Sequence, residues 1–153
     1  MNLSDQLKDQ NIFIADCYQT TDAFYADFAN FLKKIGHIND PEKIKRLFIK
    51  RESVQSTAIG KGAAAPHIFS PEFKEFTICI ALIQEGMDFK APDGQPVFLV
   101  FLIMSDDREV GLHLKSLAHI ARLVSSTDIV AKVKTAADAR TVRELILTQD
   151  RLI

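Results

Sequence analysis

The segment Val97–Met104 is apolar at every position and shows no alternation with polar residues. A strand with this pattern is buried on both faces, because a strand exposed on one face carries polar side chains at every second position. Covering both faces of a sheet takes helices on each side of it. The run is also far shorter than the roughly 20 apolar residues that a membrane-spanning helix needs. It therefore predicts an α/β fold with a β-sheet flanked by helices on both faces.

The rest of the chain supplies helices and further extended segments for such a fold. Thr77–Ile83 is a second β-rich apolar run, and two short extended pieces are expected around Gly60 and Gly62. Helices are predicted where capping residues precede apolar residues at helical spacing, at about residues 21–35, 41–51, 106–124, 128–134 and 137–147. For the second of these, Asp40 is the expected cap and Pro41 the expected first residue. The prediction is one α/β domain over residues 1–153 with a mixed sheet, and the strand order does not follow from these patterns.

Charge and cysteine content exclude several classes of protein. The net charge is −1, so there is no electrostatic case for nucleic acid or an acidic membrane surface as a partner. The two cysteines, Cys17 and Cys79, form neither a disulfide framework nor a zinc spacing, and Cys79 is expected in the core. The first residues lack the basic and apolar regions of a signal peptide. We therefore expect a cytoplasmic protein without direct membrane insertion.

The segment from Ser56 to His67 combines small residues with a proline directly before a histidine. It reads Ser-Thr-Ala-Ile-Gly-Lys-Gly-Ala-Ala-Ala-Pro-His. Glycine allows unusual dihedral angles, and Pro66 fixes its own φ and keeps Ala65 extended. We expect a short buried strand that holds His67 rigidly at its end, where it could act in catalysis or binding. An ordinary turn with a surface histidine remains the alternative.

The other three histidines differ in their surroundings along the sequence. His37 lies in a polar loop and His119 lies off the apolar stripe of its helix, so both are expected at the surface. His113 heads the stripe that continues with Leu117, Ile120 and Val124. At that place it is either a core residue or a first-turn histidine directed across the end of the sheet at His67.

Two histidines in one site suggest three chemistries. A metal site is disfavoured, because no carboxylate or cysteine lies at a convincing spacing from either histidine. A hydrolase needs an activated serine, and neither Ser56 nor Ser116 lies on a nucleophile elbow.

The third chemistry uses neutral imidazole as a nucleophile toward a phosphoryl group, and it requires no cofactor. Such a site also needs hydrogen-bond donors and positive charge for the phosphoryl oxygens. His113, backbone N–H groups and Arg51 could supply them. A solvated helix-end arginine is the alternative for Arg51.

At these positions the chain resembles a known family. The resemblance is to the enzyme IIA domain of the bacterial phosphoenolpyruvate-dependent phosphotransferase system, in its fructose/mannitol class. The matching segments are Arg51–Glu52, Ser56–His67, Pro92–Val97 and His113–Leu117. The opening Met-Asn-Leu-Ser is also similar to the nitrogen-regulatory branch of that class. The resemblance implies a mixed sheet flanked by helices.

The resemblance also implies roles for three residues. His67 matches the histidine that accepts a phosphoryl group, on Nε2, from HPr or an HPr-like phosphocarrier of the nitrogen branch. His113 matches a neighbouring histidine that stabilises the site, and Arg51 matches the arginine that neutralises phosphoryl charge. In sugar transport the group passes on to a IIB component. In the regulatory branch its presence tunes binding to a transporter, a kinase or a transcription regulator.

The chain departs from the family pattern beside the matched histidine. Ile68 stands where the family has a glycine, and alanines replace larger apolar residues before Pro66. A β-branched residue resists a positive φ, so the backbone after His67 is expected to follow a different path. A regulatory binding module with reduced or lost phosphotransfer is therefore the alternative function.

Overall fold

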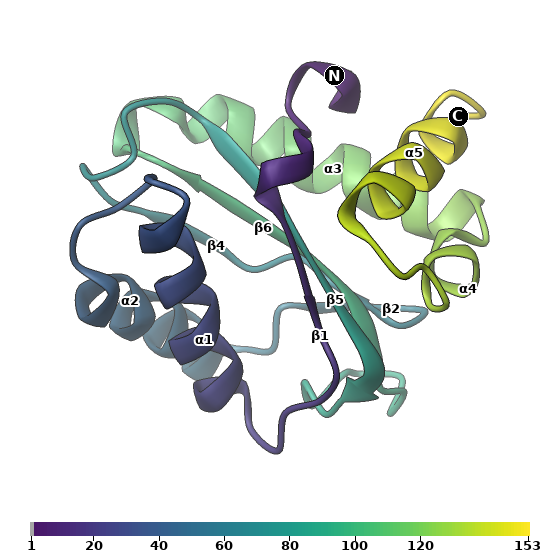
Figure 1. The fold of residues 1–153 in the computed structure, drawn as a ribbon, viewed down its shortest axis with the longest axis horizontal. Coiled ribbons are helices and arrows are strands. Elements are labelled where there is room, and N and C mark those ends of the chain that lie inside the picture. The colour runs from purple at the N-terminus through teal and green to yellow at the C-terminus, as the bar shows by residue number, and fades with distance from the viewer. Residues whose placement is uncertain (1) are drawn as a thin grey trace.

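The sheet of this protein has six strands in the computed structural model, which describes residues 2–153 (Figure 1). The strands are β1 (Ile12–Ala15), β2 (Ala58–Gly60), β3 (Ala63–Ala64), β4 (His67–Phe69), β5 (Thr77–Met87) and β6 (Val97–Ser105). The α-helices are α1 (Thr21–Lys34), α2 (Pro41–Val54), α3 (Val110–Ser126), α4 (Ile129–Val133) and α5 (Ala139–Asp150). Short 3-10 turns cover Leu3–Asp5, Asp9–Asn11 and Asp107–Glu109.

The sheet is mixed, as the sequence predicts, and its centre is an antiparallel pair. The strand order is β1-β5-β6-β3-β2, and β4 also pairs with β6. Strands β5 and β6 are antiparallel, β1 runs parallel to β5, and β3 and β4 both run parallel to β6. Strand β6 thus carries β3 and β4 one after the other along the same edge.

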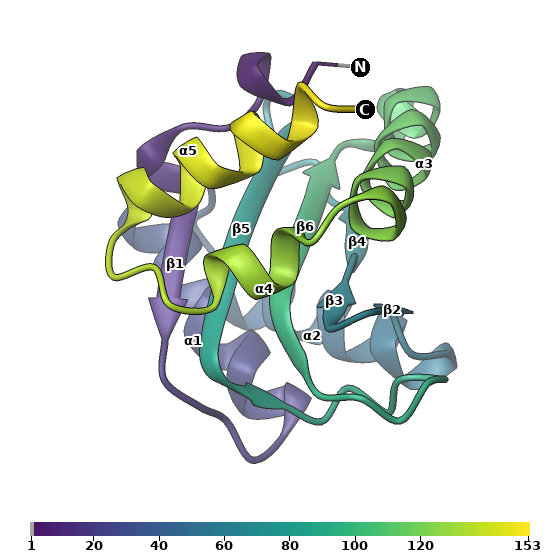
Figure 2. The ribbon, with the colours of Figure 1, turned by 90° about the vertical axis from the view of Figure 1, so that its right-hand side faces the viewer.

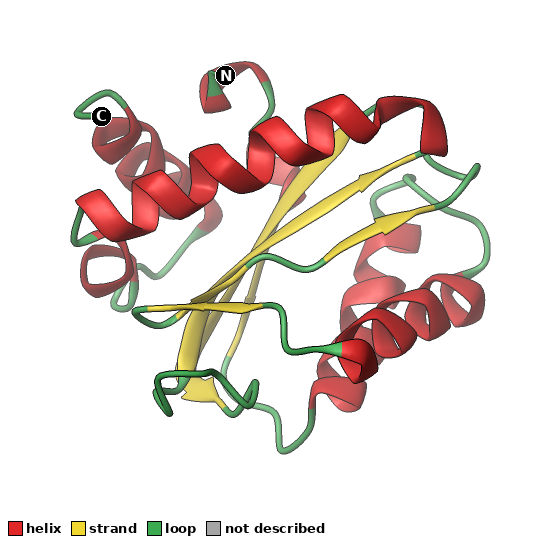
Figure 3. Ribbon diagram, turned by 180° about the vertical axis from the view of Figure 1, so that it is seen from behind, coloured by secondary structure: helices red, strands yellow, loops and turns green. Residues whose placement is uncertain are grey.

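Helices cover both faces of this sheet, which confirms the predicted fold class. Figure 2 shows α4 and α5 in front of the strands, α3 to their right, and α1 and α2 behind them. The view from behind in Figure 3 shows α3 as a long helix lying across the strands. Successive residues of β6 enter opposite cores: Leu99 and Phe101 pack on the α3 side, and Val100 and Leu102 pack on the α1 side. An unalternating apolar strand is therefore what this position requires.

The predicted helices are all present, with bounds that differ by a few residues. Thr20 and Asp40 accept hydrogen bonds from the first turns of α1 and α2, and Pro41 is the first residue of α2. Helix α3 begins later than predicted, because a 3-10 turn occupies Asp107–Glu109. Cys79 is buried, as expected. Within residues 2–153, no helix is long and apolar enough to cross a membrane.

Two parts of the sheet differ from the sequence-based expectation. Strand β1 was not predicted, because four residues between polar segments give a weak pattern and only pairing with β5 makes them a strand. The segment from Ser56 to His67 is not one strand that ends at the histidine. It forms β2, a tight turn and β3, and His67 begins β4. Pro66 lies between β3 and β4, where its missing N–H interrupts the ladder.

Candidate functional site

His67 lies at the edge of the sheet, at the start of β4. Its backbone is opposite Ile103 of β6, and the Ile103 amide donates to the carbonyl oxygen of Pro66 at 3.0 Å. The side chain is half-buried, and its Nδ1 lies 3.5 Å from the carbonyl oxygen of Ala65. Strand β6 thus binds the backbone both before and after Pro66, which holds His67 in place. Part of the imidazole remains exposed to solvent.

The structure brings His113 close to His67, and we call the place where β4, the end of β6 and the first turn of α3 meet the His67 corner. His113 lies in the first turn of α3, and its side chain is only 2% exposed. Its ring centroid is 6.2 Å from that of His67, with the two planes at 76°. One face of the His113 ring stacks on Phe69 at a centroid distance of 4.2 Å. Both alternatives from the sequence therefore hold for His113, because it is packed like a core residue and also faces the imidazole of His67.

Burial keeps both imidazoles neutral near neutral pH. Burial lowers the pKa of His67, and the nearby Arg51 charge lowers it further, although the Ala65 carbonyl opposes this. Burial also lowers the pKa of His113 to about 4, with a smaller contribution from His67. A neutral imidazole has one nitrogen with a free lone pair, so each ring has one acceptor or nucleophilic atom.

Arg51 lies in the last turn of α2, close enough to His67 for its charge to act on that ring. Its guanidinium donates to the carbonyl oxygen of Gln55 at 2.8 Å. The neighbouring Glu52 accepts from the amide of Thr57 at 2.6 Å and from the hydroxyl of Tyr25 at 2.5 Å. Glu52 thereby ties α1 to the segment between α2 and β2, a role that the sequence reading missed.

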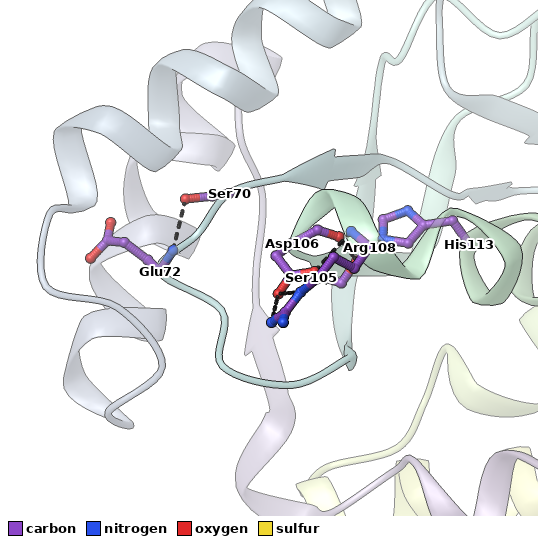
Figure 4. Close-up of polar contacts among 6 residues, drawn as sticks. All are labelled: Ser70, Glu72, Ser105, Asp106, Arg108 and His113. Carbon is purple, nitrogen blue, oxygen red and sulfur yellow. Dashed lines mark hydrogen bonds and ion pairs between the residues drawn. The ribbon is translucent and has the colours of Figure 1, made fainter.

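Ser105 is a second residue of this corner that the sequence reading missed. It ends β6 and is fully buried, and its Oγ lies 2.6 Å from Nε2 of His113. Figure 4 shows this contact beside Asp106, whose carboxylate accepts from the guanidinium of Arg108. The available signal was weak: Ser105 is the polar residue that follows an unbroken apolar run.

The Gly-Lys-Gly turn lies away from the two imidazoles. Lys61 Nζ donates to the carbonyl oxygen of Ser125, near the opposite end of α3 from His113. Lys61 has a positive φ of 56°, and Gly62 packs so closely on Val130 that a Cβ would lie 2.9 Å from its Cγ1. The small residues serve this close turn, beside a cavity of about 420 Å³.

The remaining histidines are less exposed than predicted. His37 and His119 are both half-buried. Nε2 of His37 is 2.8 Å from Oδ1 of Asn11, and Nε2 of His119 is 2.5 Å from Oδ1 of Asp150. The expectation of surface positions was wrong because the N-terminal segment and α5 pack over these residues.

Other groups that the sequence offered for catalysis have structural hydrogen bonds. Ser56 donates to the carbonyl oxygen of Phe89 at 2.5 Å, and Ser116 donates to that of Leu112 at 2.7 Å. Within residues 2–153, no group of three or more His, Cys, Asp and Glu side chains is arranged to hold a metal ion.

The residue after His67 follows a regular path despite the departure from the family pattern. Ile68 lies in β4 opposite Met104 and is 4% exposed. A β-branched side chain is favoured in such a half-buried strand. The strand therefore continues through Ile68.

The chain also matches a known protein family. Residues 5–149 match the family described as "Phosphoenolpyruvate-dependent sugar phosphotransferase system, EIIA 2". The chain therefore belongs to the EIIA type-2 family of the phosphotransferase system, whose members are phosphotransfer carriers.

Similar proteins come from both the regulatory and the sugar-specific branches. The chain is 36% identical over 100 residues to a nitrogen regulatory protein of Bradyrhizobium diazoefficiens, which covers 65% of each chain. It is 29% identical over 125 residues to the fructose-specific EIIABC component of Bacillus subtilis, which covers 82% of this chain and 20% of that protein. The chain thus spans less than two thirds of either relative.

Solved structures support the same fold. Nitrogen regulatory protein IIA-Ntr from Neisseria meningitidis superposes with a TM-score of 0.82 at 25% identity, over 94% of this chain and 98% of that one. The mannitol IIA of Escherichia coli, in a complex with phosphorylated IIB, superposes with a TM-score of 0.76 at 18% identity, over 94% and 98%.

Proposed function

We propose that the protein is a phosphohistidine carrier in which His67 accepts a phosphoryl group from an HPr-like phosphocarrier. The observation that carries the proposal is the pairing of His67 with His113 at one sheet end, with ring centroids 6.2 Å apart. Family membership supports the class of reaction. The assignment of His67 as the accepting residue and of an HPr-like protein as the donor are both parts of the proposal.

The reaction needs a free lone pair on His67. If Nδ1–H is directed at the Ala65 carbonyl oxygen, 3.5 Å away, the lone pair of the neutral ring lies on Nε2. Nε2 then attacks the phosphorus atom of the donor phosphohistidine, and a new N–P bond forms as the donor's N–P bond breaks. The donor imidazole leaves with the electron pair of its broken bond. The lowered pKa of His67 keeps the nucleophile unprotonated at neutral pH.

Two neighbouring groups suit the charge that arrives with the phosphoryl group. Arg51 places a positive charge near His67. His113 offers a ring nitrogen, and Phe69 stacks on one face of its ring and shields that face from solvent. Electrostatic stabilisation is strongest where such groups are already in place and water is excluded.

The surface around His67 is suited to a protein partner. Phe69, Val110 and Leu114 are 38%, 48% and 64% exposed, and they lie on β4 and the first turns of α3 beside the two imidazoles. Exposed apolar side chains at one place are typical of protein interaction sites. We expect the HPr-like donor to dock here, and a IIB component to dock here when it receives the group.

The test is a phosphorylation assay with matched histidine variants. The protein is incubated with phosphoenolpyruvate, enzyme I and HPr, or with the nitrogen-branch counterparts, and analysed by intact mass. We expect an acid-labile gain of one phosphoryl group in wild type and in His119→Ala, and none in His67→Ala. A label that persists in His67→Ala would reject the assignment.

A regulatory output is the second candidate, and the nitrogen regulatory relatives favour it. In that case the two negative charges of phosphorylated His67 switch the binding of a transporter, kinase or transcription regulator. Pull-downs with wild type, His67→Ala and His67→Asp test this function. Different partner sets support the switch, and identical sets in all three argue against it.

A further inference from the structure

The side chain closest to the polar edge of His113 has no role in the function proposed above. Ser105 Oγ lies 2.6 Å from Nε2 of His113, and both side chains are buried. Figure 4 shows the two residues side by side where β6 leads into the turn before α3. A hydroxyl can donate to an imidazole nitrogen or accept from it, so the position of its one hydrogen decides which tautomer His113 adopts.

The first observation that decides this is the second contact of the hydroxyl. Ser105 Oγ is also 2.8 Å from the carbonyl oxygen of Asp106, and a carbonyl oxygen can only accept. The hydroxyl hydrogen is therefore directed at Asp106. Oγ must then accept from His113, which places the imidazole proton on Nε2.

The second observation is independent of the first. Nδ1 of His113 is sealed from solvent and has no hydrogen-bond partner among residues 2–153. A buried N–H without an acceptor is rarer and more unfavourable than a buried acceptor with a free lone pair. The surroundings of Nδ1 therefore favour the same tautomer, with the proton on Nε2.

We infer that Ser105 is a positioning residue that holds His113 as the Nε2–H tautomer and so keeps a hydrogen-bond donor beside His67. The inference rests on the proposed function, because such a donor matters only if His67 carries a phosphoryl group. Nδ1 is sealed, so Nε2 is the nitrogen left to meet phosphoryl oxygens. On phosphorylation, Nε2–H moves its hydrogen bond from Ser105 to a phosphoryl oxygen. Ser105 keeps its bond to Asp106, and no proton leaves the site.

The surroundings of His113 fix its charge and its orientation, so the tautomer decides whether Nε2 can donate to a phosphoryl oxygen. The ring stays neutral near neutral pH because burial lowers its pKa to about 4. Stacking on Phe69 fixes the plane of the ring, and the contact with Ser105 fixes its orientation within that plane. A neutral ring with the other tautomer would direct a lone pair from Nε2 toward the anionic oxygens.

The first experiment reads the tautomer directly and needs neither a variant nor phosphorylation. Two-bond ¹H–¹⁵N correlation spectra of the uniformly labelled protein at pH 7 distinguish a protonated from a bare ring nitrogen. We expect His113 in wild type to be protonated on Nε2, and Ser105→Ala to gain the Nδ1–H form. A wild-type spectrum with the proton on Nδ1 would overturn the inference.

The second experiment asks whether Ser105 acts through His113. Phosphotransfer rates are compared for Ser105→Ala, His113→Ala and the double variant, with Ser116→Ala as the matched loss of a buried hydroxyl on α3. Loss of one well-placed hydrogen bond should slow Ser105→Ala about tenfold and leave Ser116→Ala unchanged. In the His113→Ala background the same Ser105 change should have no further effect.

Equal slowing by Ser105→Ala in both backgrounds would overturn the positioning role, because Ser105 would then act without His113. Failure of the proposed function would look different. Wild type would then take up no phosphoryl group at all, while the tautomer spectrum would still report on Ser105 and His113.

Discussion

Helix α3 carries two histidines whose surroundings differ. In the middle of the helix, Nε2 of His119 is 2.5 Å from a carboxylate oxygen of Asp150 in α5. In the first turn, one ring nitrogen of His113 contacts the hydroxyl of Ser105, and the other has no partner in the described part of the chain. His119 joins two helices, whereas His113 is a neutral ring that faces His67.

The difference shows what a histidine needs if it is to meet an anion. A carboxylate partner orients the ring well, but its negative charge would repel an incoming phosphoryl group. At the end of β6 near His113 the acidic side chain of Asp106 is bound by Arg108. A hydroxyl can orient His113 without adding negative charge. We therefore expect substitutions at the two histidines of α3 to affect different properties.

The largest effect is expected for phosphotransfer in His113→Ala. The rate of phosphoryl transfer from phosphorylated HPr should fall about 100-fold, because a pre-positioned donor in a dry site is lost. His119→Ala should transfer at the wild-type rate. Rapid-quench measurements with radiolabelled phosphoryl donor check both variants. Equal slowing by the two substitutions would remove the distinction between the two histidines.

The second effect is on stability in acid. The pKa of His113 is about 4 in the folded protein and about 6.5 when unfolded, so the unfolded chain binds the extra proton. This contribution to the free energy of unfolding is therefore highest above pH 6.5, where both states hold a neutral His113, and falls as the pH drops toward 4. Between pH 7 and pH 5, wild type should lose about 2 kcal/mol more unfolding free energy than His113→Ala. Urea unfolding at the two pH values measures this, and parallel losses would contradict it.

A smaller effect on the same corner is expected for Arg51. Arg51→Ala should slow phosphotransfer about tenfold, because one positive charge near the phosphoryl group is removed. Arg51→Lys should recover part of the rate, since it keeps the charge but not the planar guanidinium. Single-turnover kinetics check both variants, and unchanged kinetics in Arg51→Ala would refute this role.

The smallest effect is expected at the α3–α5 contact. His119→Ala should lower the unfolding free energy by about 1 kcal/mol, since it removes the partner of Asp150. Asp150→Asn should lower it by a similar amount, and the double variant by less than the sum. Thermal and urea unfolding give these values. Additive losses would show that the contact contributes little.

The sequence predicted those parts of the molecule that depend on local patterns. The unalternating run Val97–Met104 predicted a central strand covered on both sides, and β6 is that strand. Asp40 followed by Pro41 predicted the start of α2 to the residue. Such signals act within a few residues, so a single chain reveals them.

Features that depend on contacts between distant segments were not predictable. Strand β1 exists because β5 pairs with it. The Gly-Lys-Gly turn lies near the end of α3 away from His113, where Lys61 donates to the carbonyl oxygen of Ser125. Helical spacing placed His113 on the buried side of α3 but did not separate a core residue from a site residue. Ser105 had no motif at all, because its contact with His113 arises only when β6 and α3 meet.

The shared edge of β6 makes the length of chain before His67 a strict requirement. Ala63 lies opposite Leu99 and His67 lies opposite Ile103, so the alignment with β6 is unbroken across Pro66. Side chains of a strand point to alternate faces, so adding or deleting one residue between Ala64 and His67 would turn the imidazole toward α1 and α2. The contact between His67 and His113 therefore depends on the number of residues between β3 and His67 as well as on side-chain packing.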